Sequence, residues 1–267
     1  MRALATAGYP VPFVHLLEQD ASPFGHPFII MDRAEGKPMW PLLFESDPER
    51  GQALLTQFSA LQVRLHRLDW RPLVPDPAKY DADPYAVVDR ALRDMGDWIG
   101  RLDLADYRPP HDWLVARRDR APCARPSAVH LDLHPENVLL HADGSATVID
   151  WTQVTISDAR FDLASTLVLV GCVMGDAWRD RLLAEYERQA GAPAPEMDFF
   201  DTYACLRRLL IVAVVVHHGP GILGLRGDVL ATMKRQKRHI QWVYHRLASS
   251  IGLRVSDIER ILSSFDD

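Results

Sequence analysis

The spacing of hydrophobic positions predicts a short β-rich segment followed by helices. Two apolar runs, 14–19 and 27–31, flank a stretch rich in Asp, Ser, Pro and Gly, which is typical of a β-hairpin. Further along, apolar residues recur at intervals of three and four, the pattern of a helix with one buried face: Leu54, Phe58, Leu61, Leu65 and Leu68. Asp47 suits the N-cap of this helix and Pro48 its first position, so we expect the helix to begin there.

The pattern changes in the middle of the chain. A second helix is predicted from residue 83 or 84 to about 104, and the apolar runs after it are short and typical of strands, at 127–130, 138–140 and 146–149. Asp143 and Gly144 are a hairpin signal between the last two runs. After residue 158 the pattern is helical again, and helices are expected at about 160–174, 176–190, 196–217, 226–248 and 255–264. This order of elements predicts an α+β fold.

Composition and charge narrow the classes of protein. The chain has 267 residues, 48% of them hydrophobic, and a formal net charge of −6, so it is globular in composition and lacks the basic balance of a nucleic-acid-binding protein. The longest apolar run, 209–216, is far too short to span a bilayer. The cysteines, Cys123, Cys172 and Cys205, match no zinc pattern, and no signal peptide opens the chain. We therefore expect a cytoplasmic protein without a nucleic-acid or membrane partner.

Oxygen-bearing side chains are predicted to converge near the middle strands. Asp132 and Asn137, the only asparagine of the chain, lie in the expected loop between two strands, and Asp150 ends the hairpin that follows. The hairpin should bring these side chains toward one point. Carboxylate and amide oxygens suit Mg²⁺, which also takes ligands from substrate phosphates. The alternative is that the side chains only cap turns, but their joint spacing favours a shared site.

The same stretch resembles the catalytic loop of kinases. It reads HLDLHPENVLL, followed by VIDW and later FDLAST, and is similar to the aminoglycoside phosphotransferase and choline kinase-like family. Weaker similarities run over most of the chain, at 8–12, 27–36 and 65–68. The resemblance implies a protein kinase-like fold, with 1–36 as a remnant of the small β N-lobe and the hinge, and 37–267 as a large, mainly helical C-lobe that carries the catalytic loop.

The resemblance also implies roles for individual residues. It implies a phosphotransferase that moves the γ-phosphoryl group of ATP, or of GTP, to a hydroxyl of a small molecule. Asp132 would be the catalytic base, His130 would support the catalytic loop, and Asp162 would hold the backbone of that loop. Mg²⁺ would be held by Asn137 and Asp150. The nucleotide would contact the hinge and two apolar walls, a set made up of Met31, Asp32, Arg33, Ala34, Leu139 and Ile149.

The chain departs from the family pattern at two places. Leu131 stands where the family usually has glycine, so its side chain either alters the loop backbone or packs inward. The phosphate-covering loop, strand lysine and helix glutamate of the family's N-lobe would lie before residue 1. We therefore expect weak or no ATP turnover by the chain alone, and an open edge on the hinge strand, 27–31, that favours self-association.

Other functions remain open. The truncated N-lobe favours a catalytically impaired kinase-like binding protein or a gene remnant, and His130 with His134 raises the alternative of a metal-dependent hydrolase that uses zinc or iron. The sequence does not identify the acceptor, although acidic residues such as Asp158, Glu185 and Asp201 would suit a cationic sugar or amine. ATP turnover with a panel of hydroxyl compounds separates the kinase from the binding protein, and metal analysis tests the hydrolase.

Overall fold

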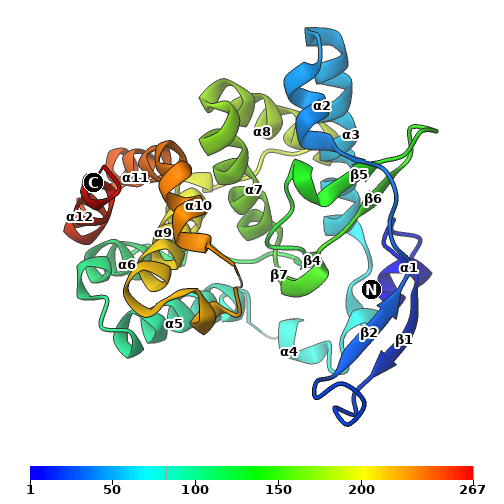
Figure 1. Ribbon diagram of the computed structural model, residues 1–267, viewed down its shortest axis with the longest axis horizontal. Helices are drawn as coiled ribbons and strands as arrows, with labels where there is room; N and C mark the ends of the chain where they lie inside the picture. Colours follow the sequence, from blue (N-terminus) through cyan, green and yellow to red (C-terminus); the bar gives the residue numbers. More distant parts are fainter. Residues whose placement is uncertain (82, 226, 267) are drawn as a thin grey trace.

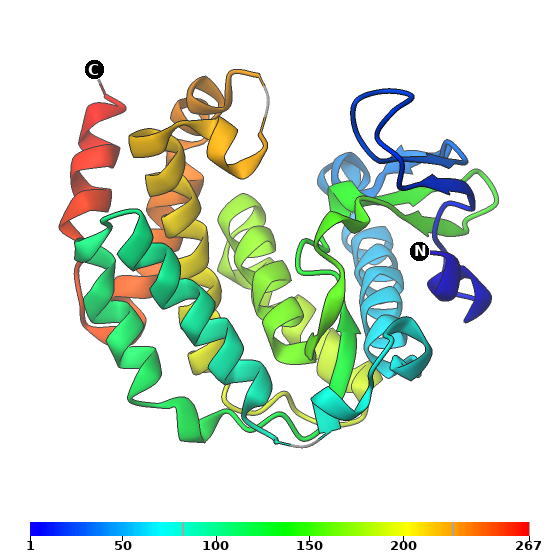
Figure 2. The ribbon, with the colours of Figure 1, turned by 90° about the horizontal axis from the view of Figure 1, so that it is seen from below.

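The computed structural model describes residues 1–81, 83–225 and 227–266. Most strands gather on one side of the molecule and the last helices on the other, with long helices between them (Figure 1 and Figure 2). The strands are β1 Val14–Glu18, β2 Phe28–Met31, β3 Lys37–Pro38, β4 Pro126–Val129, β5 Val138–Leu140, β6 Ala146–Val148 and β7 Thr155–Asp158. The α-helices are α1 Arg2–Thr6, α2 Met39–Glu45, α3 Pro48–Arg67, α4 Ala78–Asp81, α5 Ala86–Arg101, α6 Arg108–Val115, α7 Ala159–Met174, α8 Asp176–Ala190, α9 Met197–His218, α10 Val229–Arg235, α11 Lys237–Ile251 and α12 Ser256–Ser264.

The strands form small antiparallel sheets. β1 pairs with β2, so the hairpin predicted at 14–19 and 27–31 is confirmed. β5 pairs with β6 across the Asp143–Gly144 turn, as predicted, and β3 pairs with the other edge of β5. β4 pairs with β7. The sequence analysis missed β3 because it is only two residues long and contains a proline, and it missed β7 because Thr, Ser and Asp make it resemble a loop.

The long helices enclose the hydrophobic core. α3 packs against α8 and β4, and Asp47 caps it by accepting a hydrogen bond from the Arg50 backbone N–H at 2.8 Å, as the sequence predicts. The expected apolar face of α3 is buried, including Leu54 and Phe58. α7 and α9 are apolar on nearly all sides and pack against each other in the centre of the fold. This packing places α7 and α9 directly behind the loop that follows β4.

Two predicted helices have different bounds. The helix expected from 83 or 84 begins at Ala86, because the Asp83 carboxylate accepts a hydrogen bond from the Tyr85 backbone N–H at 2.8 Å and forms a turn there. The helix expected over 226–248 is two helices, α10 and α11, which meet at Gln236, and residue 226 lies outside the described residues.

Short helices also escaped prediction. α2 and α6 carry prolines in their first turns, and proline clusters suggest loops when read without structure. Within the described ranges, no helix combines the length and apolar character needed to cross a membrane. The α+β class, with a small β part and a mainly helical remainder, is confirmed.

Candidate active site

The predicted catalytic loop connects β4 to β5. β4 is buried along its whole length, and just beyond it the chain turns at Leu131, whose φ of 62° lies in the left-handed region. A 3-10 helix, Pro135–Asn137, closes the loop at the start of β5. Left-handed backbone is unfavourable for a leucine, so other contacts must hold the loop in this shape.

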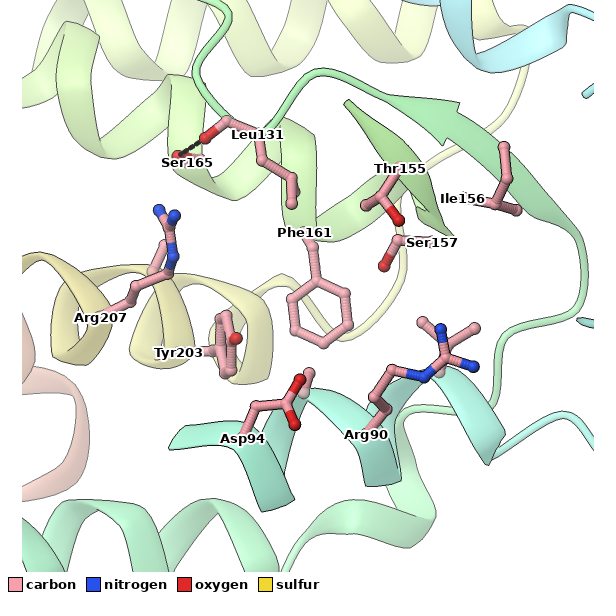
Figure 3. A pocket seen from close by; sticks show the side chains of 13 residues that line it. Arg90, Asp94, Leu131, Thr155, Ile156, Ser157, Phe161, Ser165, Tyr203 and Arg207 are labelled. Carbon is pink, nitrogen blue, oxygen red and sulfur yellow. Dashed lines mark hydrogen bonds between the residues drawn. The ribbon is translucent and has the colours of Figure 1, made fainter. Parts of the chain in front are cut away.

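Side chains of α7 supply those contacts. The Asp162 carboxylate accepts a hydrogen bond from the Leu131 backbone N–H. The Ser165 hydroxyl donates a hydrogen bond to the Leu131 carbonyl oxygen at 3.2 Å, which Figure 3 shows as a dashed line. The second Asp162 oxygen lies 2.9 Å from Nε2 of His66 on α3, whose Nδ1 lies 2.8 Å from the Tyr186 hydroxyl. Asp162 thus fixes the loop backbone, as the sequence analysis expected.

The environment of Asp162 favours its ionised form. Complete burial acts to raise its pKa, but the hydrogen bond and charge of His66, the charge of His130 and the Leu131 N–H outweigh burial and hold the pKa below the ordinary value of 3.8. A carboxylate with a lowered pKa keeps its negative charge near neutral pH. It therefore remains a strong hydrogen-bond acceptor for the loop.

His130 lies behind the loop and joins it to the segment of Asp150. Its buried ring hydrogen-bonds through Nε2 to the Ile149 carbonyl oxygen at 2.9 Å, and its centroid lies 4.6 Å from that of Trp151. These contacts suit support of the loop and leave Nε2 occupied. No group of three or more His, Cys, Asp or Glu among the described residues could hold a metal ion. The zinc or iron hydrolase therefore gains no support from the described residues.

Asp132 is half-buried, and its pKa is raised. Burial raises its pKa above the ordinary value of 3.8, while His134, His130 and Arg208 act in the opposite direction. Oδ1 of Asp132 lies 3.8 Å from Nε2 of His134, and burial lowers the pKa of that imidazole. A carboxylate with a raised pKa binds a proton more readily than an ordinary aspartate, which suits general-base chemistry.

Asn137 is held in place by the backbone of both loop segments. Its side-chain nitrogen donates a hydrogen bond to the Asp132 backbone carbonyl oxygen at 2.9 Å. The backbone carbonyl oxygen of Asn137 accepts a hydrogen bond from the Ile149 N–H at 2.9 Å. The nitrogen is thus turned toward the loop. Among the described residues, no hydrogen bond engages the side-chain oxygen of Asn137, which leaves this oxygen available to a ligand.

Asp150 follows Ile149, whose backbone N–H bonds to Asn137, and carries the second predicted ligand group. It is exposed, has a φ of 61°, and accepts a hydrogen bond from the Thr152 hydroxyl at 2.9 Å. Its charge contributes to the raised pKa of Asp132, which indicates that the two carboxylates are electrostatic neighbours. One amide oxygen and one carboxylate suit Mg²⁺, because this ion usually keeps several waters and takes further ligands from phosphates. The donor set therefore fits the predicted magnesium site.

The predicted apolar walls lie on one face of the β5–β6 hairpin. Val138 and Val148 are paired and buried, so strand alternation turns Leu139 and Ile149 toward the opposite face, where both are half-buried. A shared face on which two apolar side chains remain partly accessible is suited to one side of a flat aromatic base. Contact with a nucleotide stays a prediction.

The predicted hinge leads from β2 into β3. The Asp32 backbone N–H donates to the Phe13 carbonyl oxygen at 2.8 Å, which continues the β1–β2 pairing by one residue. Gly36 then lets β3 approach β5 closely, since a Cβ built there would lie 2.6 Å from the Leu140 carbonyl oxygen. Of the other hinge residues, Met31 and Arg33 are exposed and Ala34 is half-buried. Their contact with adenine also stays a prediction.

Asp132 opens onto a cavity of about 510 Å³ between the loop and α9. Its wall includes two arginines of α9, Arg207 and Arg208, that the sequence analysis did not single out. The sequence analysis missed these arginines because α9 is so apolar around them that its sequence is typical of a core helix. The signal that points to them is the interruption of that apolar run by two consecutive charged residues.

The acids that the sequence analysis suggested for a cationic acceptor are already engaged. All of them are buried, and each is paired with arginine at 2.7 Å or less. The pairs are Asp158 with Arg160, Glu185 with Arg188, and Asp201 with Arg179 and Arg246. These carboxylates are therefore occupied by arginine, and the suggestion that they attract a cationic acceptor is wrong.

Known proteins share this fold. Residues 1–203 match the phosphotransferase enzyme family. A protein from Ralstonia eutropha JMP134 that is proposed to be an aminoglycoside phosphotransferase is 18% identical, with a TM-score of 0.69 over 92% of this chain and 80% of that chain. The choline kinase LicA from Streptococcus pneumoniae is 15% identical, with a TM-score of 0.59 over 92% of this chain and 77% of that chain, and LicA has also been solved in complex with AMP.

A curated relative matches a smaller region. Acyl-CoA dehydrogenase family member 10 from Mus musculus is 28% identical over 176 residues, which cover 61% of this chain. The chain spans only 15% of the length of that relative. The family match covers well over half of the chain and includes the loop with Asp132, Asn137 and Asp150. The chain thus belongs to the phosphotransferase enzyme family and has its protein kinase-like fold.

Proposed function

We propose that the protein transfers the γ-phosphoryl group of ATP to a hydroxyl of a small molecule. The observation that carries this proposal is the arrangement of Asp132, Asn137 and Asp150 on two segments that a backbone hydrogen bond from Ile149 to Asn137 joins. Asp132 also lines a cavity whose volume, about 510 Å³, is in the range of small-molecule sites. Membership in the phosphotransferase enzyme family supports the same class of reaction.

In the proposed reaction Asp132 orients the acceptor hydroxyl and takes up its proton. The acceptor oxygen forms a bond to the γ-phosphorus while the bond from that phosphorus to the β–γ bridging oxygen breaks, and ADP leaves with the electron pair. Asn137 and Asp150 would hold Mg²⁺, which offsets the negative charge of the phosphates when it is bound. The raised pKa of Asp132 supports its role as the proton acceptor.

His130 and Asp162 are positioning residues in this proposal. Asp162 holds the backbone of Leu131, the residue before Asp132, and His130 ties the same loop to the carbonyl of Ile149, the residue before Asp150. A displacement of about 1 Å in a reacting group can reduce a rate by about 100-fold. The two buried side chains therefore matter because they fix the distance between the base and the metal ligands.

The nucleotide base is proposed to lie against Leu139 and Ile149, next to the hinge at 31–34. The half-buried, apolar character of the two walls supports this placement. The solved complex of LicA with AMP supports an adenine nucleotide over a guanine nucleotide.

The test is phosphoryl transfer from ATP to a panel of hydroxyl compounds, followed as ADP release. Asp132→Asn should lower kcat by about 10²–10⁴-fold, because the base is lost, while the melting temperature stays unchanged. Asp97→Asn, at an exposed carboxylate of α5, is the matched control and should keep full turnover. Unaltered turnover in Asp132→Asn would overturn the assignment of the base.

A second candidate function is nucleotide binding with little or no turnover. The described strands β1 and β2 carry no lysine, so the sheet itself offers no ammonium group to the phosphates. Lys37 lies beyond the hinge in β3. Calorimetry with ADP and Mg²⁺, carried out beside the turnover assay, separates the candidates. Binding of ADP without ADP release from ATP on any hydroxyl compound favours the second.

A further inference from the structure

The cavity beside Asp132 has an unusual charge for a site that would bind a cation. Among its described wall residues, the charged groups are Asp132, Arg207 and Arg208. Asp132 is the carboxylate that the proposed reaction uses, so the rest of the wall contributes two positive charges and no negative one. A cationic sugar or amine would meet repulsion here.

Neither arginine forms an ion pair with an acid among the described residues. Arg207 donates a hydrogen bond to the side-chain oxygen of Gln153, a neutral group, and Arg208 has no hydrogen bond or ion pair with any described residue. Both are half-buried on α9. Arg208 is near enough to the loop for its charge to lower the pKa of Asp132.

Some buried or half-buried arginines are paired with carboxylates, as in Arg160 with Asp158 and Arg179 with Asp201. Arg181, in contrast, is half-buried and bonds to the neutral side chain of Gln52. A half-buried guanidinium is costly to leave without an anionic partner, because its charge loses part of its hydration. Arg207 and Arg208 line the cavity together with Asp132, so a ligand bound there can supply the anionic partner that they lack.

A smaller neighbouring cavity, about 190 Å³ in volume, extends the same wall. It shares Arg207 and Ser165 with the first cavity and adds the exposed side chains of Arg90 and Asp94 on α5. In Figure 3 the Arg207 guanidinium points toward Leu131 and Ser165, whereas Asp94 lies on the opposite side of the cavity, beside Tyr203 and Arg90. Asp94 therefore leaves the guanidinium of Arg207 open to a ligand.

We infer that the acceptor carries an anionic group, a carboxylate or a phosphate, in addition to the hydroxyl that receives the phosphoryl group. Arg207 and Arg208 hold the anion, while the hydroxyl faces Asp132. Guanidinium groups suit this task because their planar donors match the oxygens of carboxylates and phosphates. The inference rests on the proposed function and names the substrate class of its acceptor site.

The reaction balances for such an acceptor. The hydroxyl oxygen bonds to the γ-phosphorus of ATP, the bond from that phosphorus to the bridging oxygen breaks, and ADP leaves with the electron pair. The hydroxyl proton goes to Asp132. The carboxylate or phosphate of the acceptor is unchanged, so Arg207 and Arg208 act in binding and orientation.

The test uses probes with one carbon skeleton and different charges. These are glycerol, glycerate, glycerol 3-phosphate and 3-aminopropane-1,2-diol, and binding to the full chain is measured by calorimetry in the presence of ADP and Mg²⁺. The anionic probes should bind at least 10-fold more tightly than glycerol, and the amine more weakly. The comparison of glycerate with glycerol 3-phosphate distinguishes a carboxylate site from a phosphate site.

Variants assign the preference to the two arginines. Arg207→Gln and Arg208→Gln should each weaken binding of the preferred anion by about 10- to 100-fold, the range for a lost hydrogen bond to a charged group, with glycerol unaffected. Arg208→Lys should retain part of the preference, and Arg208→Glu should reverse it toward the amine. Arg238→Gln, at an exposed arginine of α11, is the control and should bind like the wild type.

The outcomes separate this inference from the proposed function. Equal binding of all probes, no binding of either anion, or a preference for the amine overturns the anionic acceptor. Loss of ADP affinity in the arginine variants, with the probe preference unchanged, also overturns it, because the arginines would then serve the nucleotide. Anion binding without ADP release from ATP keeps the anion site and counts against phosphoryl transfer. Circular dichroism of each variant confirms that it is folded.

Discussion

The carboxylate of Asp162 holds the backbone N–H of Leu131 across 31 positions of the chain, and Leu131 is the residue directly before Asp132. The hydrogen bond keeps a leucine in the left-handed region, with a φ of 62°. The same carboxylate bonds to His66 on α3, so one buried side chain links α3 and α7 to the loop that precedes β5. The position of the candidate base is therefore set by a group that does not face the cavity.

Asp162→Asn should destabilise the protein by about 1–3 kcal/mol, because it removes a charged acceptor from a buried network. The pKa of Asp162 is lower in the folded chain than the ordinary 3.8, so its contribution to stability is present above that value and is lost as the pH falls through the lowered pKa. Urea unfolding at several pH values checks this. The variant should lose less stability than the wild type between neutral and acidic pH, and an equal loss in both proteins would contradict the network.

Leu131→Gly should be more stable than Leu131→Ala by about 1 kcal/mol, because glycine adopts a positive φ freely and alanine does not. Both variants remove the same apolar contacts, so their difference isolates the backbone. At a position with negative φ, the alanine variant would instead be more stable than the glycine variant. Paired urea unfolding curves give the difference directly, and a more stable alanine variant would show that the positive φ is not a source of strain.

The rate should depend on the ionisation of Asp132. Since burial raises the pKa of this carboxylate above 3.8, kcat/KM should fall on the acid side with an apparent pKa above 3.8. The charge of Arg208 lowers the pKa of Asp132, so Arg208→Gln should move the acid limb further upward. The pH profile of each protein is the measurement, with Arg238→Gln as control. An apparent pKa of 3.8 or lower for the acid limb would contradict the assignment of Asp132 as the base.

Asp150→Asn should weaken Mg²⁺-dependent binding of ADP by at least about 10-fold, because a carboxylate ligand becomes a neutral amide. Asparagine tolerates the positive φ of 61° at this position, so the variant changes charge with little change in backbone. Calorimetric titration of ADP at increasing Mg²⁺ gives the affinity, and Asp97→Asn serves as the control. Equal Mg²⁺ dependence in both variants would exclude Asp150 as a ligand.

The hinge strand should promote self-association. Among the described residues β2 pairs only with β1, and Ile29, Ile30 and Met31 are each more than two-fifths exposed. A strand edge with exposed apolar side chains is a site for pairing with another chain. Sedimentation should show a mass above 30.2 kDa that rises with concentration, and Ile30→Lys should suppress the increase. Val115→Lys, at an exposed apolar residue of α6, should not suppress it.

Local sequence patterns predicted the parts of the protein that depend on near neighbours. The β1–β2 hairpin, the cap of α3 at Asp47 and the β5–β6 hairpin all form between segments that are close together in the sequence. The β5–β6 hairpin also brings the segments of Asn137 and Asp150 together, while a shared role of their side chains with Asp132 stays a prediction. Short elements with proline or polar residues, such as β3 and β7, lack a strong local pattern and form only when a partner strand is present.

Tertiary packing decided the charge of the cavity beside Asp132. Arg207 and Arg208 lie about 75 positions after Asp132 in an apolar helix, and the packing of α9 against α7 places them in the same cavity wall as Asp132. Packing between helices also pairs Asp201 with Arg179 and Arg246, whereas Asp158 and Glu185 pair with arginines two and three positions further along the chain. Periodicity shows which face of a helix is apolar, but the partners of Asp201 depend on which distant helices lie opposite. The physical reason is that ion pairing is decided by distance in space, and sequence spacing reports that distance only within one helix or hairpin.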